Sequence, residues 1–204
     1  MNYLAHLYLS EPTEAAWLGS LLGDFVKGPL DGRYGEDITR AIALHRKIDS
    51  FTDAHPVVLR SKSRISPVRR RYAGIMMDMF YDHFLARHWD EYHPESLGVF
   101  TSRFYRILCR NHHRLPPRLY AVAPLMVRGD WLGSYAEVVA VRSALDRMGK
   151  RLKRENPLLD STDELVDNYR DLEADFRAFL PEVLRFARGQ SLAPILSSDQ
   201  RTSP

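Results

Sequence analysis

Residues 75–85 of this sequence read IMMDMFYDHFL. They lie in a predicted helix over residues 68–89, and the middle of that helix is apolar on nearly every side. A helix of this kind belongs in the interior of a protein rather than on its surface. The stretch therefore predicts a helical fold that is organised around one buried helix.

Apolar side chains recur at helical spacing on both sides of this stretch, which predicts further helices. These cover residues 2–9, 10–26, 37–52, 56–66, 97–110, 118–127, 131–154 and 162–188, with a polar, glycine-rich loop at 28–36. No segment alternates like a strand, and no repeat or linker divides the chain. We therefore predict an all-α fold, a single helical bundle with one domain over residues 1–188. The serine-rich residues 189–204 are predicted to form a flexible tail.

The composition of the 204 residues is that of a globular protein, with 45% hydrophobic and 27% charged residues. Cys109 is the single cysteine, so an intramolecular disulfide is excluded and a cytoplasmic location is expected. The first residues lack the basic segment and cleavage site of a signal peptide. No uncharged apolar run is long enough to cross a bilayer, so no membrane association is predicted.

Polar side chains interrupt the apolar face of the predicted helix over residues 37–52. His45 and Asp49 are four residues apart, so both point from one side of that helix. That side also carries Ile42 and Ile48, whereas the opposite face is basic and polar. A buried carboxylate is unfavourable unless it is paired or binds a metal ion, so this pair indicates a functional site.

The central helix repeats the pattern with Asp78, Asp82 and the adjacent His83. Two carboxylates one turn apart repel each other unless a cation or a proton lies between them. His6 and Asp24 add two further polar groups to the apolar N-terminal helices. Mn²⁺ and Mg²⁺ favour carboxylate oxygens, and imidazole suits transition metals. We interpret the whole set as a metal site; the alternative is a buried salt-bridge network with nearby arginines.

A cationic stretch lies between Asp53 and Asp78, with no acid among its residues. Its members are Arg60, Lys62, Arg64, Arg69, Arg70 and Arg71. Such a surface attracts an acidic protein, a phosphate or nucleic acid, although a merely solvated helix face fits the pattern equally well. Nucleic acid is not expected as a partner, because no zinc-finger spacing, RNP-type strand or glycine-rich RNA-binding loop is present.

Four stretches together resemble the acyl carrier protein phosphodiesterase family. They read NYLAHL at residues 2–7, GDFVKG at 23–28, HRKIDSFTD at 45–53 and DHFLARHW at 82–89. The resemblance implies hydrolysis of the phosphodiester between a serine of holo-acyl carrier protein and 4′-phosphopantetheine. It also implies a distant relation to the HD phosphohydrolases, and hence a helical fold like theirs. These enzymes bind a divalent metal ion, so we expect Mn²⁺ here, with Mg²⁺ as the alternative. The sequence contains no His-Asp dipeptide, so the metal ligands of those enzymes cannot be transferred position by position.

The expected site residues combine the helical pattern with this resemblance. The predicted metal ligands are His6, Asp24, His45, Asp49 and Asp82. A metal-bound water would supply hydroxide, with Asp24, His45 and His83 as catalytic residues and either histidine as the general acid. Lys27 or Arg46 would neutralise charge on the phosphoryl oxygens. The acidic carrier protein would dock on Arg64, Arg69 and Arg70.

Two other functions are compatible with the same residues. The first is an HD-like phosphatase or phosphodiesterase that acts on a nucleotide or another small phosphate ester. The second is a non-enzymatic helical module that binds an acidic protein. Metal binding and the choice of substrate distinguish these alternatives from carrier-protein hydrolysis.

Overall fold

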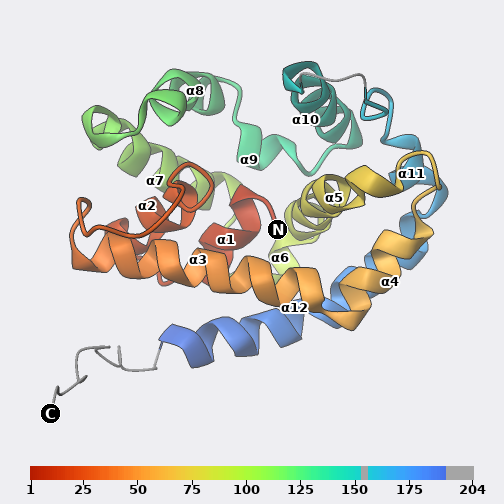
Figure 1. The fold of residues 1–204 in the computed structure, drawn as a ribbon, viewed down its shortest axis with the longest axis horizontal. Helices are drawn as coiled ribbons and strands as arrows, with labels where there is room; N and C mark the ends of the chain where they lie inside the picture. The colour runs from red at the N-terminus through yellow and green to blue at the C-terminus, as the bar shows by residue number, and fades with distance from the viewer. Residues whose placement is uncertain (153–155, 192–204) are drawn as a thin grey trace, which may run out of the picture.

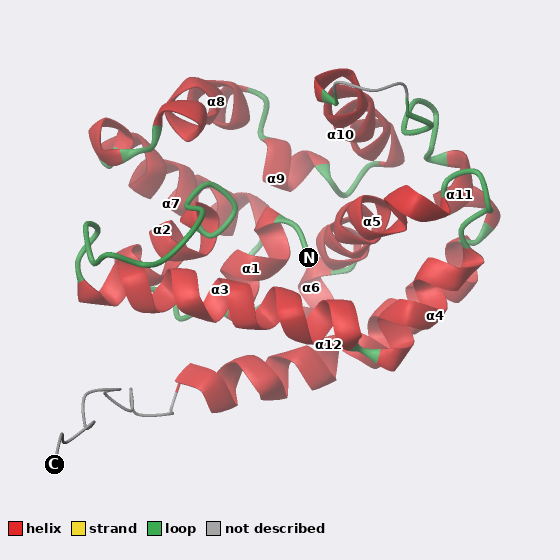
Figure 2. Ribbon diagram, in the orientation of Figure 1, coloured by secondary structure: helices red, strands yellow, loops and turns green. Residues whose placement is uncertain are grey.

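The computed structural model describes residues 1–152 and 156–191, and within these ranges it is helical with no strand. The α-helices are α1 (Tyr3–Leu9), α2 (Glu14–Leu22), α3 (Glu36–Ala54), α4 (Pro56–Arg64), α5 (Ala73–Arg87), α6 (Trp89–Tyr92), α7 (Leu97–Arg110), α8 (Pro117–Arg128), α9 (Trp131–Ser134), α10 (Val138–Arg151), α11 (Asp163–Asp167) and α12 (Tyr169–Ser191). Two short 3-10 helices are η1 (Arg70–Tyr72) and η2 (His112–Arg114). The predicted all-α class is confirmed, as Figures 1 and 2 show.

Helix α5 lies at the centre of the fold and contacts α1, α4, α10 and α12 (Figure 1). Its side chains Met76, Phe80, Phe84 and Leu85 are fully buried, so the prediction of a central buried helix is confirmed. None of the described helices is long and apolar enough to span a membrane. The contacts of α5 fix the helices around it, among them α1, which carries one residue of the candidate site.

Several helices differ in extent from the predictions. Helix α5 starts at Ala73 rather than at residue 68, because Arg70 donates hydrogen bonds to the carbonyls of Ser63 and Ile65 and holds the chain in a turn. The helix predicted over residues 131–154 is two helices, α9 and α10. The chain bends between them at an extended Glu137. The predicted segment 162–188 likewise divides into α11 and α12.

Part of the predicted C-terminal tail is helical. Residues 189–191 complete α12, which extends to Ser191 despite an internal Pro181. Residues 192–204 lie outside the described part of the chain.

Two glycines allow α2 to pack directly on α3. A Cβ atom on Gly19 would lie 2.4 Å from the Cβ of Ala41, and one on Gly23 would lie 2.2 Å from the ring of His45. Both distances are far below van der Waals contact, so any larger residue at either position would force the helices apart. The close approach of α2 therefore sets the position of His45.

A buried carboxylate joins α4 to α12. Asp175 is 2% exposed and accepts hydrogen bonds from Arg60 at 2.6 Å, from Ser61 at 2.9 Å and from Arg64 at 3.1 Å. Ser61 also lies 2.8 Å from the hydroxyl of Tyr81 on α5. Because each oxygen of the carboxylate is paired, the network holds three helices in one register.

We expect Asp175→Ala to lower the free energy of unfolding by about 2–4 kcal/mol, because it removes the buried acceptor that Arg60, Ser61 and Arg64 share. The control is Asp171→Ala, which removes a 65%-exposed carboxylate that pairs with Arg64 alone. That variant should lose less than about 1 kcal/mol. Urea unfolding of both variants is the measurement, and equal losses would contradict the special role of Asp175.

Candidate metal centre

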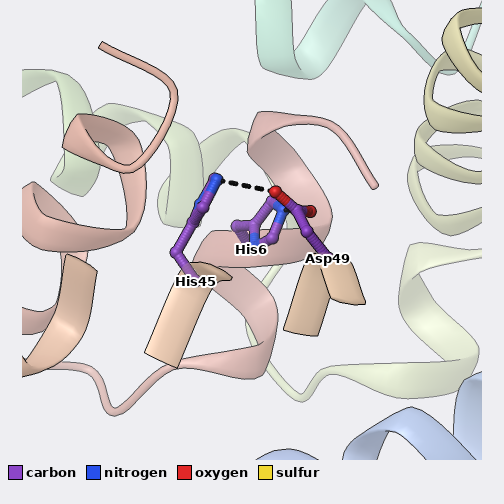
Figure 3. A group of neighbouring side chains, drawn as sticks. All are labelled: His6, His45 and Asp49. Atoms are coloured by element: carbon purple, nitrogen blue, oxygen red, sulfur yellow. Dashed lines mark hydrogen bonds and ion pairs between the residues drawn. The ribbon is translucent and has the colours of Figure 1, made fainter. Parts of the chain in front are cut away.

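His6, His45 and Asp49 converge in one group, as Figure 3 shows. His6 comes from α1, and the other two lie one turn apart on α3. The Nε2 atom of His6 is 3.0 Å from Oδ1 of Asp49, and the Nε2 atom of His45 is 3.1 Å from Oδ2. The two imidazole rings stack with their centroids 3.8 Å apart. One ligand atom from each residue lies within 4.8 Å of the others, a spacing that a single metal ion can bridge.

Burial differs sharply within this group. His6 and His45 are only 1% and 2% exposed, whereas the Asp49 side chain is 40% exposed. The imidazoles are therefore held rigidly by the core, and the carboxylate faces the opening of the site. An arrangement of this kind positions the ligands from within and leaves one side accessible to a substrate.

The protonation states of the group suit metal binding. Burial lowers the pKa of His6 to about 4, so its imidazole is neutral at pH 7. Burial by itself would raise the pKa of Asp49, but hydrogen bonds from His45 and His6 lower it, and the carboxylate is ionised. Neutral imidazoles and an ionised carboxylate are the forms in which these side chains coordinate metal ions.

One ring nitrogen of each histidine can still accept a further partner. Each contacts the ionised Asp49 carboxylate through Nε2, which must then carry the proton. The Nδ1 atoms of His6 and His45 are buried and have no hydrogen-bond partner among the described residues. Such orphaned buried atoms are rare and call for an ion or a water molecule. The residues present thus fit a divalent transition metal, for which mixed imidazole and carboxylate ligands are typical.

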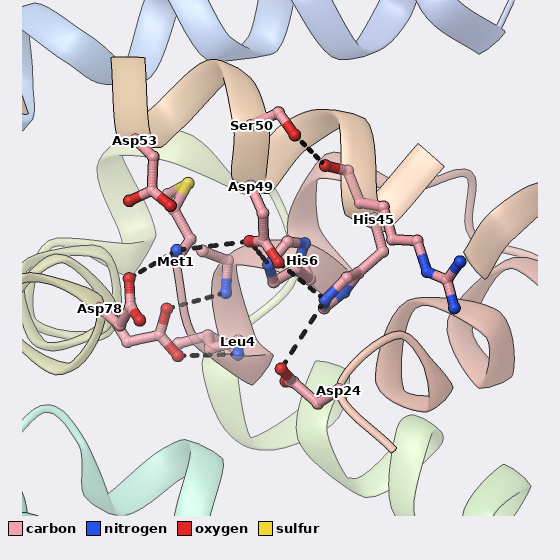
Figure 4. Close-up of polar contacts among 12 residues, drawn as sticks. Met1, Leu4, His6, Asp24, His45, Asp49, Ser50, Asp53 and Asp78 are labelled. Carbon is pink, nitrogen blue, oxygen red and sulfur yellow. Dashed lines mark hydrogen bonds and ion pairs between the residues drawn. The ribbon is translucent and has the colours of Figure 1, made fainter. Parts of the chain in front are cut away.

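Asp24 lies at the edge of this group, on the side away from α5 (Figure 4). One of its oxygens is 3.8 Å from Nε2 of His45, and its side chain is 41% exposed. Burial and the charge of Asp49 raise its pKa, against the attraction of His45 and Lys27. Asp24 is therefore the predicted site residue that lies nearest to the three converging side chains.

An amino group and a second carboxylate lie at the opposite edge. The amino group of Met1 is 2.8 Å from Asp78 and 3.8 Å from Asp49 (Figure 4). Burial lowers the pKa of this amine, but the charges of Asp78 and Asp49 outweigh it and raise the pKa to about 10. The predicted repulsion among the acids is thus relieved on this side by an ammonium group. Sequence reasoning missed this contact, and no motif signals it.

Asp82 is not in the converging group. Its carboxylate is fully buried, and its oxygens accept hydrogen bonds from the backbone amides of Leu4 at 2.8 Å and Ala5 at 3.1 Å. These amides begin α1, where no side chain of the preceding Asn2 provides a cap. Burial raises the pKa of Asp82 to about 7 despite these hydrogen bonds. Both oxygens are thus engaged with the start of α1, the helix that carries His6, and the prediction of Asp82 as a metal ligand stays a prediction.

His83 also points elsewhere. Its Nδ1 lies 2.8 Å from the carbonyl oxygen of Tyr135, and its Nε2 lies 3.0 Å from the hydroxyl of Tyr169. Both ring nitrogens therefore serve to attach α5 to the turn before α10 and to α12. The structure does not bring this predicted general acid to the group around Asp49.

The two predicted phosphate-binding cations have different surroundings. Arg46 donates hydrogen bonds of 2.8 Å to the carbonyls of both Gly28 and Val26, so it holds the loop that follows α2. Lys27 is exposed on that loop, and its charge acts on Asp24. Arg46 thus spends its hydrogen-bond donors on the loop, whereas Lys27 has no hydrogen bond or ion pair with any other described residue.

The fold and this centre define an all-helical protein with two buried histidines and a part-exposed aspartate in a group suited to a metal ion. The chain belongs to the acyl carrier protein phosphodiesterase family, whose model matches residues 1–183. A relative from Serratia proteamaculans, named acyl carrier protein phosphodiesterase, is 36% identical over 94% of this chain and 100% of the relative. One of the same name from Photorhabdus laumondii is 32% identical over 93% of this chain and 96% of the relative. No solved structure matches, so the likeness to the HD phosphohydrolase fold stays a prediction.

We expect Asp82→Asn to lower the free energy of unfolding by about 1–3 kcal/mol, because the amide NH₂ cannot accept a hydrogen bond from the start of α1. Displacement of α1 should weaken Mn²⁺ binding by about 10–100-fold without changing its stoichiometry. Urea unfolding and metal titration measure the two effects. Complete loss of metal binding at unchanged stability would make Asp82 a ligand.

The lowered pKa of His6 predicts a pH dependence of stability for the metal-free protein. Below pH 6.5 the unfolded chain takes up a proton on this histidine, whereas the folded protein does so only near pH 4. Stability should therefore fall as the pH drops from 6.5 to 4, by on the order of 3 kcal/mol. Urea unfolding in EDTA measures this slope, which His6→Gln should reduce. His113→Gln, a change at an exposed histidine, is the control and should leave the slope intact.

Proposed function

We propose that this protein hydrolyses the phosphodiester between 4′-phosphopantetheine and a serine of holo-acyl carrier protein, with a divalent metal ion at His6, His45 and Asp49. Membership of the family supports the substrate. The observation that carries the metal site is the convergence of two buried imidazoles on one ionised carboxylate. Mn²⁺ suits this mixed set better than Mg²⁺, which prefers oxygen ligands alone.

The chemistry divides between the ion and the protein. A bound divalent ion lowers the pKa of a water molecule and polarises a phosphoryl oxygen. The core holds His6 and His45 rigidly, so the ligand positions do not have to be organised when the substrate arrives. Asp49 spans both histidines and orients their rings.

Asp24 is our proposed general base. Its Oδ1 atom lies 3.8 Å from Nε2 of His45 at the accessible edge of the group. Burial raises the pKa of Asp24, which brings that pKa closer to pH 7. A base is most effective when its pKa approaches the working pH. Asp24 would take the proton of the attacking water and then deliver it to the serine oxygen that leaves.

Lys27 is our proposed partner for the phosphoryl oxygens. Its ammonium is exposed on the loop beside Asp24, and Arg46 holds that loop by donating hydrogen bonds to two of its backbone carbonyls. We propose that Arg46 acts only by positioning this loop. A cation at the accessible side of the centre offsets the negative charge that builds up during phosphoryl transfer.

The accessibility of the centre fits a substrate that is attached to a protein. Asp24 and Asp49 are each about two-fifths exposed at 41% and 40%, so a phosphodiester at a protein surface reaches them without entering a deep cavity. We also propose a cytoplasmic location, which the single cysteine favours.

We expect His45→Ala and Asp49→Asn each to reduce hydrolysis of holo-carrier protein by more than about 100-fold, because each removes a group that would hold the ion. EDTA should abolish the wild-type activity, and added Mn²⁺ should restore it. The measurement is the mobility shift and mass loss that accompany conversion to apo-carrier protein. His113→Ala is the matched control, and full turnover by His45→Ala without bound metal would contradict the proposal.

A further inference from the structure

A shallow groove of about 430 Å³ lies where α4, η1 and the start of α5 meet. It is lined by Leu59, Lys62, Ser63, Arg70, Arg71, Ala73 and Gly74. Three of these residues are cationic and none is acidic, and the apolar residue Leu59 is 51% exposed. The groove therefore offers positive charge around a small apolar contact.

The structure divides the cationic stretch of residues 60–71 into two groups. Arg64 pairs with Asp171 and Asp175, and Arg69 donates to the carbonyl of Pro157 and lies 3.5 Å from Glu164. These two of the three predicted docking residues are thus engaged with the C-terminal helices and the segment before them. They hold the fold together and are poorly placed to meet a partner.

The cations of the groove are placed differently. Arg70 is exposed, and its hydrogen bonds go to carbonyl oxygens, which leave its charge uncompensated. Arg71 is exposed and has no hydrogen bond or ion pair within the described ranges. Lys62 pairs with one carboxylate, the exposed Asp53. The groove, rather than the whole basic stretch, is the surface that retains positive charge for a partner.

The groove also adjoins the candidate metal centre. The ammonium of Lys62 lies 2.8 Å from Asp53, which follows Asp49 by one turn of α3. Gly74 precedes Asp78 by about one turn of α5, and Asp78 binds the Met1 amine beside Asp49. Each of these four-residue helical steps rises by about 6 Å. Figure 4 shows Asp53 and Asp78 together at that edge of the centre.

We propose that this groove docks an acidic, amphipathic helix of the carrier protein. Its carboxylates would meet Lys62, Arg70 and Arg71, and an apolar side chain would rest against Leu59. The inference builds on the proposed function. A phosphodiester on a serine is only a few bonds from the carrier backbone, so the carrier must contact the surface next to the metal ion. The groove is at that place and has the complementary charge.

Gly74 provides a test by steric blocking. A Cβ atom added there meets no atom within 4 Å, so Gly74→Trp places a side chain at the groove without disturbing the core. Gly98 is likewise a helical glycine with open space around its Cβ position, on α7, and Gly98→Trp is the matched control. We expect Gly74→Trp to raise the KM for holo-carrier protein and the Kd for apo-carrier protein by about tenfold or more, and Gly98→Trp to change neither.

Charge reversal provides an independent arm. Arg71→Glu should weaken carrier binding by about 5–10-fold at low salt and reduce its salt dependence. Arg106→Glu, at an exposed arginine of α7, is the control for the change in net charge. Arg71→Glu and Arg106→Glu should both leave the Mn²⁺-dependent hydrolysis of bis(p-nitrophenyl) phosphate unchanged, because that small diester needs no docking surface.

The outcomes separate the two proposals. Wild-type carrier binding and KM in both Gly74→Trp and Arg71→Glu would overturn the groove assignment while the proposed function stands. A wild-type protein that cleaves bis(p-nitrophenyl) phosphate but neither binds nor cleaves holo-carrier protein would overturn the proposed function and the occupant of the groove together. If duplex DNA binds more tightly than carrier protein and Gly74→Trp abolishes that binding, the occupant of the groove is nucleic acid rather than the carrier helix.

Discussion

Both oxygens of Asp82 accept hydrogen bonds from the first amides of α1, although the carboxylate is fully buried in the core. A buried carboxylate is stable only when such donors satisfy it. Helices α1 and α5 therefore cannot separate without a large loss of folding free energy. Helix α1 has seven residues, too few to be stable by itself. Its position, and with it that of His6, therefore depends on α5.

The second half of the site depends on the contact between α2 and α3. Gly19 and Gly23 bring the two helices so close that the ring of His45 rests against the backbone of α2. Asp49 then bridges His45 and the histidine delivered by α1. Two helices, α1 and α3, thus meet at one carboxylate, and neither could form this centre alone.

The charges around the centre are segregated. Acids border the metal centre, with Asp24 on one side and Asp78 on the other, whereas the groove beside α4 is lined by cations. The proposed divalent ion and the proposed acidic partner would thus be attracted to different parts of the surface. Segregation of this kind orients a charged partner as well as attracting it, because the partner is repelled from the wrong register.

Helical periodicity, a local property, was sufficient to predict the all-α class, the central buried helix and the pairing of His45 with Asp49 on one face. It was insufficient for Asp82 and His83, whose inward placement looked the same in sequence. Their hydrogen-bond partners, the start of α1 and the two tyrosines, come from distant segments. The sequence by itself determined which polar side chains share one face of a helix, but not their burial, because Asp49 is 40% exposed whereas Asp82 is fully buried. Only the tertiary structure decided whether each one faces a metal centre or a backbone amide, because that depends on which helix packs opposite.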